Sequence, residues 1–316
     1  MALEYADGPA VYILHDNPEW IPPLAAALEA EGVPYREWPL VGGSFDLAQD
    51  PPEGVFWSRL SASAHTRGNA RAKEHTRAVL RWLEAAGRTV VNGSDVTELE
   101  VSKVAQYVAL RRAGFDVPRT IAVLGDDDLS RRARELPLPF ITKHNQGGKG
   151  LGVRRFDSYE EFDAHLAAGD REEPVDGILL LQEYLPAAEP FITRAEFVGG
   201  ELVYAVRVDT SAGSFELCPA EACAVPAAAP SLFARRPEIT AEHPLIAGLA
   251  AFLRAHRVEV AGVEFIETAD GRTVPYDINT NTNYNPDVEN DGGVSAATTV
   301  ARFLQRRLAE TYAVAR

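Results

Sequence analysis

A glycine-rich segment at residues 143–153 carries the first residue types that could do chemistry. Between two predicted strands, it runs through Lys143, Gly147, Gly148, Lys149, Gly150 and Val153. Glycines let backbone N–H groups approach phosphate oxygens, and lysines supply the opposite charge. The spacing fits neither the dinucleotide-binding fingerprint, which needs a glycine at position 153, nor a Walker A loop, which needs Ser or Thr after Lys149. The segment therefore indicates either another kind of phosphate-binding loop or an ordinary surface turn.

A second group of residues with oxygen side chains lies on a predicted hairpin. Glu264 is on its first strand, and Asp277 and Asn279 are on its second. Because side chains alternate along a strand, Asp277 and Asn279 share a face, and pairing across the hairpin can bring Glu264 beside them. Carboxylate and amide oxygens suit a hard divalent cation. The three residues are candidate ligands for Mg²⁺ or Mn²⁺, and a solvated polar hairpin face is the alternative.

The elements that must position these residues alternate between strands and helices in the first hundred residues. The sequence predicts strands at 11–14, 55–57 and 89–92, with helices at about 18–31 and 69–86 between them. That order favours a parallel α/β layer.

The remaining sequence predicts a second group of strands and helices. Helices are expected at 98–112, 159–168 and 243–254, and strands at 120–123, 139–143, 153–156 and 178–181. Two further hairpins are expected to turn at 199–200 and 270–271, and residues 222–230 to form a loop.

Composition and charge limit the class of protein. The 316 residues correspond to about two domains of ordinary size, and 46% of them are hydrophobic. An excess of 46 acidic over 31 basic side chains gives a net charge of -15, which opposes a general attraction to nucleic acid or anionic membranes. Cys218 and Cys223 are too few for a disulfide framework and lack the histidines of a zinc site. With no secretion signal or spanning segment, we expect a cytoplasmic protein.

Several short motifs follow one another along nearly the whole chain. They are Ser-Arg-Leu-Ser-Ala-Ser at 58–63, Val-Asn-Gly at 91–93, Lys103, the segment 115–120, Phe-Ile-Thr-Lys at 140–143 with its glycine loop, Leu-Gln-Glu-Tyr-Leu at 181–185 and Asp-Ile-Asn at 277–279. This order resembles the ATP-grasp fold, and most closely the ligases of the RimK, LysX and glutathione-synthetase type. It implies an N-terminal parallel α/β domain of the pre-ATP-grasp kind (1–97), followed by a two-lobed α+β ATP-grasp module. That module would consist of a central lobe with the phosphate loop (98–182) and a C-terminal lobe with the metal site (183–316).

The resemblance also implies residue roles in ATP binding. The lysines would contact phosphates, residues 147–153 would fold over them, and residues 183–185 would bind adenine through backbone groups. The implied ATP-binding set is Lys103, Lys143, Gly147, Gly148, Lys149, Gly150, Glu183, Tyr184, Leu185 and Glu189. For Lys103 the alternative is a solvated helix lysine.

The chain departs from the family pattern in three places. Glu264 precedes Asp277, the reverse of the usual order of the two metal carboxylates. Ile192 replaces the usual Asp two residues before Arg194, so the ribose contact passes to Glu189 or to backbone groups. Lys149 is an additional cation that either reaches the γ-phosphate or points into water.

Arg194 and Arg207 lie on the two strands of the hairpin that turns at 199–200. In the resembling ligases an arginine here holds the γ-phosphate and the acyl phosphate, a task that suits the planar guanidinium fork. We predict catalytic roles for Arg207, Arg194 and Lys143. Cross-strand surface salt bridges are the alternative for the two arginines.

Two regions are expected to line the substrate pocket, residues 59–67 and 280–285. The candidate residues are Arg59, Ser61, Ser63, His65, Arg67, Asn281 and Asn283. Arg59 and Arg67 are candidates to clamp a carboxylate, which favours an amino acid or short peptide; each could instead be a surface arginine.

The implied reaction is the ATP-dependent joining of a carboxylate to an amine through an acyl phosphate, with release of ADP and phosphate. Two alternatives stay open, a small-molecule phosphotransferase and a degenerate nucleotide-binding regulatory module. The expected partners are amino-acid or peptide substrates, without nucleic acid or membrane, and a homo-oligomer is left open.

Overall fold

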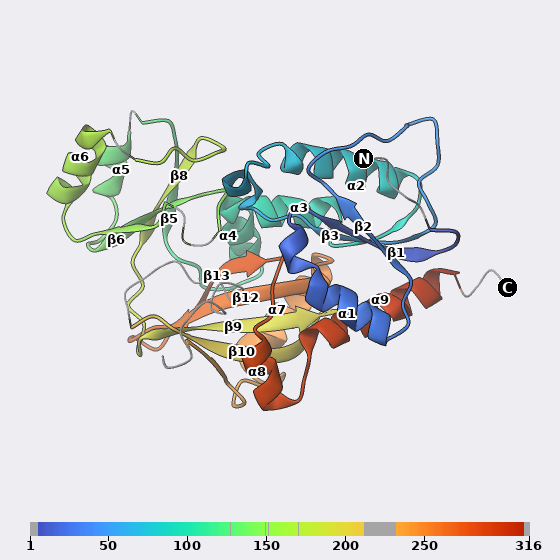
Figure 1. Cartoon of the computed structure of the whole chain (residues 1–316). Coiled ribbons are helices and arrows are strands. Elements are labelled where there is room, and N and C mark those ends of the chain that lie inside the picture. The colour runs from blue at the N-terminus through green and yellow to red at the C-terminus, as the bar shows by residue number, and fades with distance from the viewer. Residues whose placement is uncertain are drawn as a thin grey trace.

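The computed structural model describes residues 6–126, 128–148, 150, 152–169, 171–211 and 232–312, arranged around three sheets (Figure 1). Lys149, Cys218, Cys223 and the expected loop at 222–230 lie outside these ranges. Within them, no helix combines the length and the apolar character needed to cross a membrane.

The first sheet is parallel throughout, as predicted. Its strands are β1 (Ala10–His15), β2 (Tyr35–Pro39), β3 (Gly54–Arg59) and β4 (Thr89–Val91), in the order β2-β1-β3-β4. The short helices η1 (Pro18–Trp20) and η2 (Ala64–Arg67) and the longer α1 (Pro22–Ala30) and α2 (Ala72–Ala85) connect these strands. Every residue of β1 is buried, as in a parallel strand covered on both faces.

The helix predicted at 98–112 is two helices, α3 (Ser94–Val101) and α4 (Lys103–Arg112). They are separated at Ser102, which has extended backbone angles and caps α4 by accepting a hydrogen bond from the Ala105 N–H. Lys103 is therefore the first residue of a capped helix.

The second sheet is antiparallel and belongs to the central part of the chain. It consists of β5 (Thr120–Leu124), β6 (Phe140–His144), β7 (Arg154–Phe156) and β8 (Ile178–Glu183), in the order β5-β8-β6-β7. Helices α5 (Leu129–Ala133) and α6 (Tyr159–Ala168) accompany it. Phe140, Phe156 and Phe162 pack together in its core.

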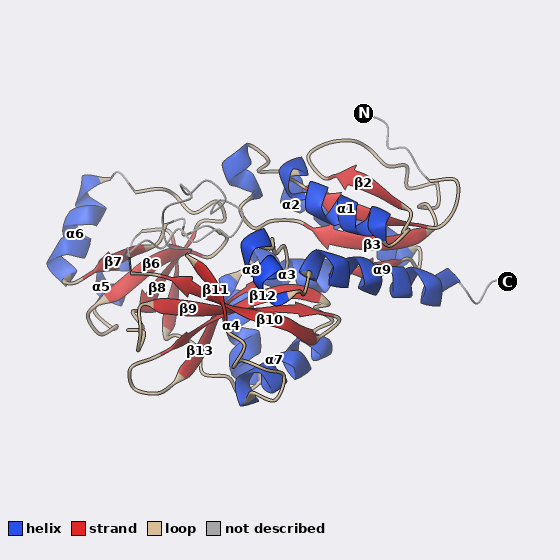
Figure 2. Cartoon of the chain, turned by 60° about the horizontal axis from the view of Figure 1, so that its bottom comes forward, coloured by secondary structure: helices blue, strands red, loops and turns tan. Residues whose placement is uncertain are grey.

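The third sheet is a five-stranded antiparallel sheet. Its order is β11 (Phe233–Arg235), β10 (Glu201–Asp209), β9 (Phe191–Val198), β12 (Val260–Glu267) and β13 (Thr273–Asn279). Both predicted hairpins are present, and Gly199 and Gly200 turn the first with φ of 63° and 76°. Helix α7 (Pro244–Ala255) packs on one face, with Leu249 and Leu253 in the same core as Phe265 (Figure 2).

The last two helices, α8 (Pro286–Gly292) and α9 (Ala296–Tyr312), were not predicted from the sequence. Helix α9 packs against α1, β1 and β3 (Figures 1 and 2). Val300 and Leu304 of α9 share a hydrophobic core with Ile13 of β1. A linear division at residues 97 and 182 therefore separates α9 from a core to which it contributes, and the domain boundaries stay a prediction.

Candidate active site

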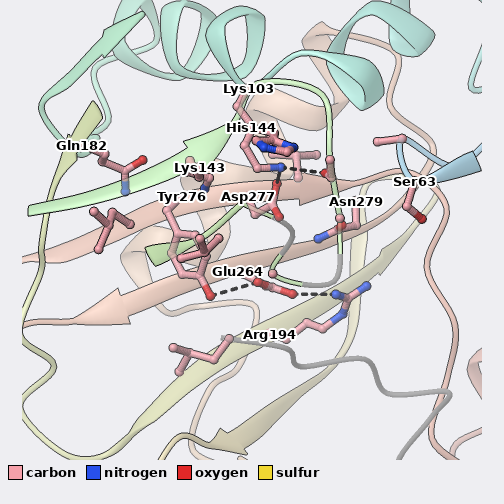
Figure 3. A pocket seen from close by; sticks show the side chains of 18 of the residues that line it. Ser63, Lys103, Lys143, His144, Gln182, Arg194, Glu264, Tyr276, Asp277 and Asn279 are labelled. Carbon is pink, nitrogen blue, oxygen red and sulfur yellow. Dashed lines mark hydrogen bonds and ion pairs between the residues drawn. The ribbon is translucent and has the colours of Figure 1, made fainter. Parts of the chain in front are cut away.

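A cavity of about 460 Å³ lies where the three sheets meet, a size typical of small-molecule sites (Figure 3). Most of the residues predicted for the site line it. They are Ser61, Ser63, Lys103, Lys143, Gly147, Gly148, Gly150, Glu183, Tyr184, Leu185, Arg194, Glu264, Asp277, Asn279, Asn281 and Asn283. Trp20, Glu100, His144, Gln182 and Tyr276 also line it and were not predicted.

The carboxylate cluster is held on one face of the third sheet. Glu264 pairs with Asp277 across β12 and β13, and it pairs with Arg194 of β9 on its other side. Directly paired residues of neighbouring strands share a face. Arg194 donates hydrogen bonds of 2.7 Å to Glu264 Oε1 and 2.7 Å to Glu196 Oε1. A Cβ atom at Gly262 would lie 2.5 Å from Arg194 Nη2, so the absence of a side chain there leaves room for the guanidinium.

Burial and neighbouring charges shift the pKa values of Glu264 and Asp277 in opposite directions. Burial raises the pKa of Glu264 above its ordinary value, which Arg194 opposes and the nearby Asp277 reinforces. Burial would also raise the pKa of Asp277, but the ammonium groups of Lys103 and Lys143 lower it below the ordinary value. Lys103 Nζ donates to Asp277 Oδ1 at 3.0 Å and to the Gly147 carbonyl at 3.3 Å.

The residues present fit a magnesium ion that would also bind phosphate oxygens. Glu264, Asp277 and Asn279 offer two carboxylates and one amide, and magnesium in nucleotide sites uses one or two carboxylates plus substrate phosphates. The buried Asn279 Nδ2 has no hydrogen-bond partner among the described residues. Among the described residues, no three or more His, Cys, Asp or Glu side chains are grouped so that they could hold a metal ion by themselves. A site shared with phosphate therefore fits better than a site made by protein alone.

Lys143 is a buried lysine without a carboxylate partner in the described ranges. Its Nζ donates to the Tyr107 hydroxyl at 3.2 Å and lies 5.8 Å and 5.6 Å from the ring centres of Tyr107 and Tyr276. Burial lowers its pKa below the ordinary lysine value, against the opposing effect of Asp277 and Glu264. An unpaired buried ammonium in a cavity is suited to bind an anionic ligand.

The predicted adenine-binding residues lie at the end of β8. The Glu183 side chain is held by Arg119, whose backbone N–H donates to Glu183 Oε1 at 2.8 Å. Tyr184 lies under the guanidinium of Arg155, 4.6 Å from the ring centre. Glu183, Tyr184 and Leu185 thus line the cavity at the C-terminal end of β8, an interior strand of the second sheet.

Arg207 and Glu189 do not line the cavity. A register shift between Leu202 and Tyr204 makes Arg207 pair with Thr193, so Arg207 faces the side of the sheet opposite to Arg194. Its guanidinium lies 4.4 Å from the ring centre of Phe191. This position does not fit the phosphate contact predicted for Arg207, and the exposed Glu189 is likewise not placed for a ribose contact.

Three of the predicted substrate residues, Arg59, His65 and Arg67, also do not line the cavity. Arg59 is 2% exposed and donates to the Thr282 carbonyl at 2.8 Å and to Asn283 Oδ1 at 2.9 Å. Burial lowers its pKa to about 10. Arg67 forms an ion pair with the buried Asp16. Neither arginine is placed to clamp a substrate carboxylate, so that prediction is corrected.

Glu100 is a functional candidate that the sequence did not reveal. It is buried, and it accepts hydrogen bonds from the Ala62 N–H at 3.0 Å and the Thr280 N–H at 2.7 Å. Burial raises its pKa, and the nearby Asp277 raises it further. Since Glu100 lies within a helical stretch without a recognisable motif, no local signal identified it.

Sequence comparisons find partial relatives. No protein-family model matches the chain. A probable alpha-L-glutamate ligase of Xanthomonas euvesicatoria pv. vesicatoria is 29% identical over 150 residues, 47% of this chain and 50% of that protein. The tetrahydromethanopterin:alpha-L-glutamate ligase of Methanosarcina acetivorans is 32% identical over 145 residues, 43% of this chain and 44% of that protein. The chain thus spans about half the length of the curated relatives it matches.

Solved structures match nearly the whole chain. A RimK domain ATP-grasp protein from Sphaerobacter thermophilus has a TM-score of 0.65 at 18% identity, covering 94% of this chain and 99% of that one. The ATP-grasp ligase PsnB, complexed with a minimal precursor, has a TM-score of 0.68 at 17% identity, covering 95% and 99%. The chain therefore has the ATP-grasp fold, as the order of its motifs predicted.

Proposed function

We propose that this protein is an ATP-dependent ligase that joins a carboxylate to an amine. The observation that carries the proposal is the meeting, in one cavity, of the unpaired buried Lys143, the paired Lys103 and the carboxylates Glu264 and Asp277. Cations and metal ligands at a shared point suit phosphoryl transfer, which depends mainly on positioning and on neutralisation of charge. The ligase names of the partial sequence relatives add support.

The chain's own residues have distinct tasks in this reaction. Lys143 and Lys103 bind the phosphates of ATP, and residues 183–185 hold its adenine at the end of β8. Glu264, Asp277 and Asn279 would hold Mg²⁺ or Mn²⁺, which would supply positive charge that stabilises the phosphates when bound. Arg194 is committed to Glu264 and Glu196, so it fixes the position of a carboxylate ligand and adds positive charge at the cavity wall.

The chemistry runs in two steps. A carboxylate oxygen of one substrate attacks the γ-phosphorus of ATP, the bond to the bridging oxygen breaks, and an acyl phosphate and ADP form. The amine of the other substrate then attacks the acyl carbon, loses a proton, and expels phosphate to leave an amide. The positive side chains stabilise the charge that moves from the bridging oxygen to the ADP.

The first substrates to test are amino acids and short peptides. Relatives named alpha-L-glutamate ligases suggest glutamate, and PsnB in complex with a precursor suggests a peptide. The net charge of -15 opposes a nucleic-acid partner, which is consistent with action on small molecules.

The test is to identify the nucleotide product and to trap the intermediate. With ATP, Mg²⁺ and a panel of amino acids and dipeptides, we expect ADP and phosphate in step with amide formation. With the amine replaced by hydroxylamine, a hydroxamate should form. AMP and pyrophosphate as main products would contradict the proposal, and a stable phosphorylated alcohol or amine without hydroxamate would establish the phosphotransferase alternative.

A further inference from the structure

A row of asparagines lines the cavity at the end of β13 and in the segment that follows it. Asn279, Asn281 and Asn283 all face it, while the intervening Thr280 and Thr282 are buried in the protein. Figure 3 shows Asn279 and Ser63 on the same side of the pocket. The segment therefore presents amide groups, and no charged group, toward the cavity.

Buried hydrogen bonds keep this alternation in place. Thr280 donates through its N–H and its hydroxyl to Glu100 Oε2, at 2.7 Å and 2.8 Å. The Thr282 hydroxyl accepts from Arg194 and donates to Glu196 Oε2, at 2.7 Å and 2.8 Å. Since both threonines are anchored inward, the neighbouring asparagines are directed outward into the cavity.

Asn281 and Asn283 still have hydrogen-bonding groups to offer a ligand. A guanidinium can only donate, so the bond from Arg59 to Asn283 Oδ1 leaves the Asn283 NH₂ group as the one offered to a ligand. Neither amide atom of Asn281 has a partner among the described residues, and both atoms are buried. Leaving a buried amide unpaired is unfavourable, so a ligand that pairs with Asn281 would recover its hydrogen bonds.

Among the described residues, the cation nearest to these asparagines, Arg59, does not line the cavity, and its guanidinium donates to the Trp20 and Thr282 carbonyls and to Asn283 Oδ1. Of the four cationic side chains that line the cavity in the described ranges, Lys103 and Arg194 are paired with carboxylates of the metal-ligand cluster. Arg155 is paired with Asp157 and lies over Tyr184, at the end of β8. Lys143 lies near the rings of Tyr107 and Tyr276 and binds an ATP phosphate in the proposed function.

The Glu100 carboxyl group also disfavours an anionic ligand at this end of the cavity. Glu100 lines this end of the cavity and is tied to Ala62 and Thr280, with no basic partner in the described ranges. On the other wall, the hydroxyls of Ser61 and Ser63 are hydrogen-bonded to each other at 2.8 Å. Ser63 Oγ also accepts at 3.1 Å from Arg67, whose charge is paired with Asp16. A substrate carboxylate placed here would be buried near the Glu100 carboxyl group, while the Arg59 guanidinium is covered by Asn283 and does not reach the cavity, so the placement is costly.

We propose that Asn281 and Asn283 bind a neutral amide of the amine-bearing substrate, either a peptide bond or a carboxamide, and that this end of the cavity rejects a free carboxylate. The inference rests on the proposed function, because it describes one substrate of that reaction. An amide group offers one acceptor and one donor, which match the donor and acceptor of Asn281, and its oxygen can also accept from Asn283.

The test compares matched amines. Each amino acid is supplied as the free acid, as its carboxamide and as the first residue of a dipeptide, with ATP, Mg²⁺ and a carboxylate that yields a hydroxamate. We expect kcat/KM for the carboxamide or the dipeptide to exceed that of the free acid by about 10-fold or more, because a hydrogen-bonding site discriminates strongly against an unmatched partner. A preference for the dipeptide over the carboxamide would assign the amide to a peptide backbone.

Two variants and a control isolate Asn281. Asn281→Asp removes the donor and adds negative charge, so it should raise KM for the amide forms by about 10-fold without rescuing the free acid. Asn281→Lys supplies the missing cation and should shift the preference toward the free acid. Asn285→Asp should change neither, because Asn285 caps α8 through its Oδ1, which aspartate retains, and does not line the cavity.

The outcomes separate the inference from the proposed function. Free acids preferred by the parent enzyme, with ADP and amide formed, would overturn the inference and leave the ligase proposal intact. If no carboxylate gives a hydroxamate and no amine gives ADP, the ligase proposal fails. Thermal shifts by the same acids and carboxamides, with a non-hydrolysable ATP analogue bound, then still decide which form the cavity binds.

Discussion

The two ends of the cavity differ in charge and in the way their side chains are held. At the phosphate end, Lys103, Arg194, Glu264 and Asp277 are fixed by direct ion pairs, and the carboxylates and Arg194 lie on paired strands. At the asparagine end the side chains offered to a ligand are the neutral amides of Asn281 and Asn283, which lie beyond the last strand in the described ranges, and Glu100 adds a carboxyl group instead of a cation. In the proposed reaction, phosphoryl transfer therefore depends on charges that a sheet positions, whereas substrate choice depends on hydrogen bonds from a loop.

The first sheet contributes differently to the two ends. It holds the asparagine segment through Arg59 of β3, which bonds to Thr282 and Asn283, and through Asn92 after β4, which donates to the Thr280 carbonyl at 3.2 Å. It supplies none of the four cations that line the cavity in the described ranges. Changes at the phosphate end should therefore abolish turnover with every substrate, and changes at Arg59 or Asn92 should alter substrate affinity alone.

The largest effect is expected for Asp277→Asn. Replacing the carboxylate removes a candidate metal ligand and leaves the buried Lys103 without its partner, so turnover should fall by about 100-fold or more. Phosphate release measures the loss, and removal of divalent metal by EDTA should reproduce it in the parent enzyme. A thermal melt identifies any loss of folding, and full activity with EDTA would contradict the metal assignment.

Lys143→Met should lower kcat/KM for ATP by about 30-fold to 100-fold, because a buried countercharge to phosphate is lost. The parent enzyme should also lose kcat/KM as pH rises. The ammonium that binds phosphate is present below the pKa and lost above it, and burial lowers that pKa, so the loss occurs at a pH below the ordinary lysine range. A pH profile of Lys143→Met should lack this alkaline decline; an unchanged decline would assign it to another group.

A smaller and selective effect is expected at the neutral end. Arg59→Met removes the donors to Thr282 and Asn283, so KM for the amine substrate should rise by about 10-fold while KM for ATP stays within about twofold. Steady-state kinetics with each substrate varied in turn measures the difference. Equal increases in both constants would show that the two ends are not independent.

The smallest effect is expected for Arg207→Ala. Because Arg207 lies on the opposite face and contacts Phe191, its loss should change kcat by less than about twofold and stability by about 0.5–1 kcal/mol. Hydroxamate formation and urea unfolding measure the two quantities. A loss of more than tenfold in hydroxamate formation would restore the catalytic role that the sequence suggested.

Arg207 also shows why the site could be predicted only in part. Counted from the turn at Gly199 and Gly200 without interruption, Arg207 would pair with Ile192 and share the face of Arg194. The bulge between Leu202 and Tyr204 shifts the pairing by one residue, which moves Arg207 to the other face. The Glu264 hairpin also has a register shift, which lies between its turn and the Glu264–Asp277 pair. Counted from the turn without interruption, Glu264 would pair with Tyr276, so the shift is what brings Glu264 beside Asp277.

Some elements had too weak a local signal to be predicted. Strand β2 has only one buried residue, Trp38, and ends in Pro39, so it lacks the run of apolar residues that marked β1 and β3. The predictions of Arg59 and Arg67 as substrate clamps failed for a different reason. An arginine's sequence neighbours do not reveal whether its guanidinium will meet buried partners from other segments, such as Thr282 and Asp16.

The sequence by itself determined the order of the elements, the glycine loop beside Lys143 and the shared face of Asp277 and Asn279, because backbone period and residue type act over short distances. Only the tertiary structure decided which charged side chains are paired within the protein and which remain free to bind a ligand. Glu100, Arg59 and Arg194 lie far apart in the chain, and only folding brings each to the partners that neutralise or satisfy it. Electrostatic and hydrogen-bonding roles depend on distance in space, and that distance is set by packing of the three sheets.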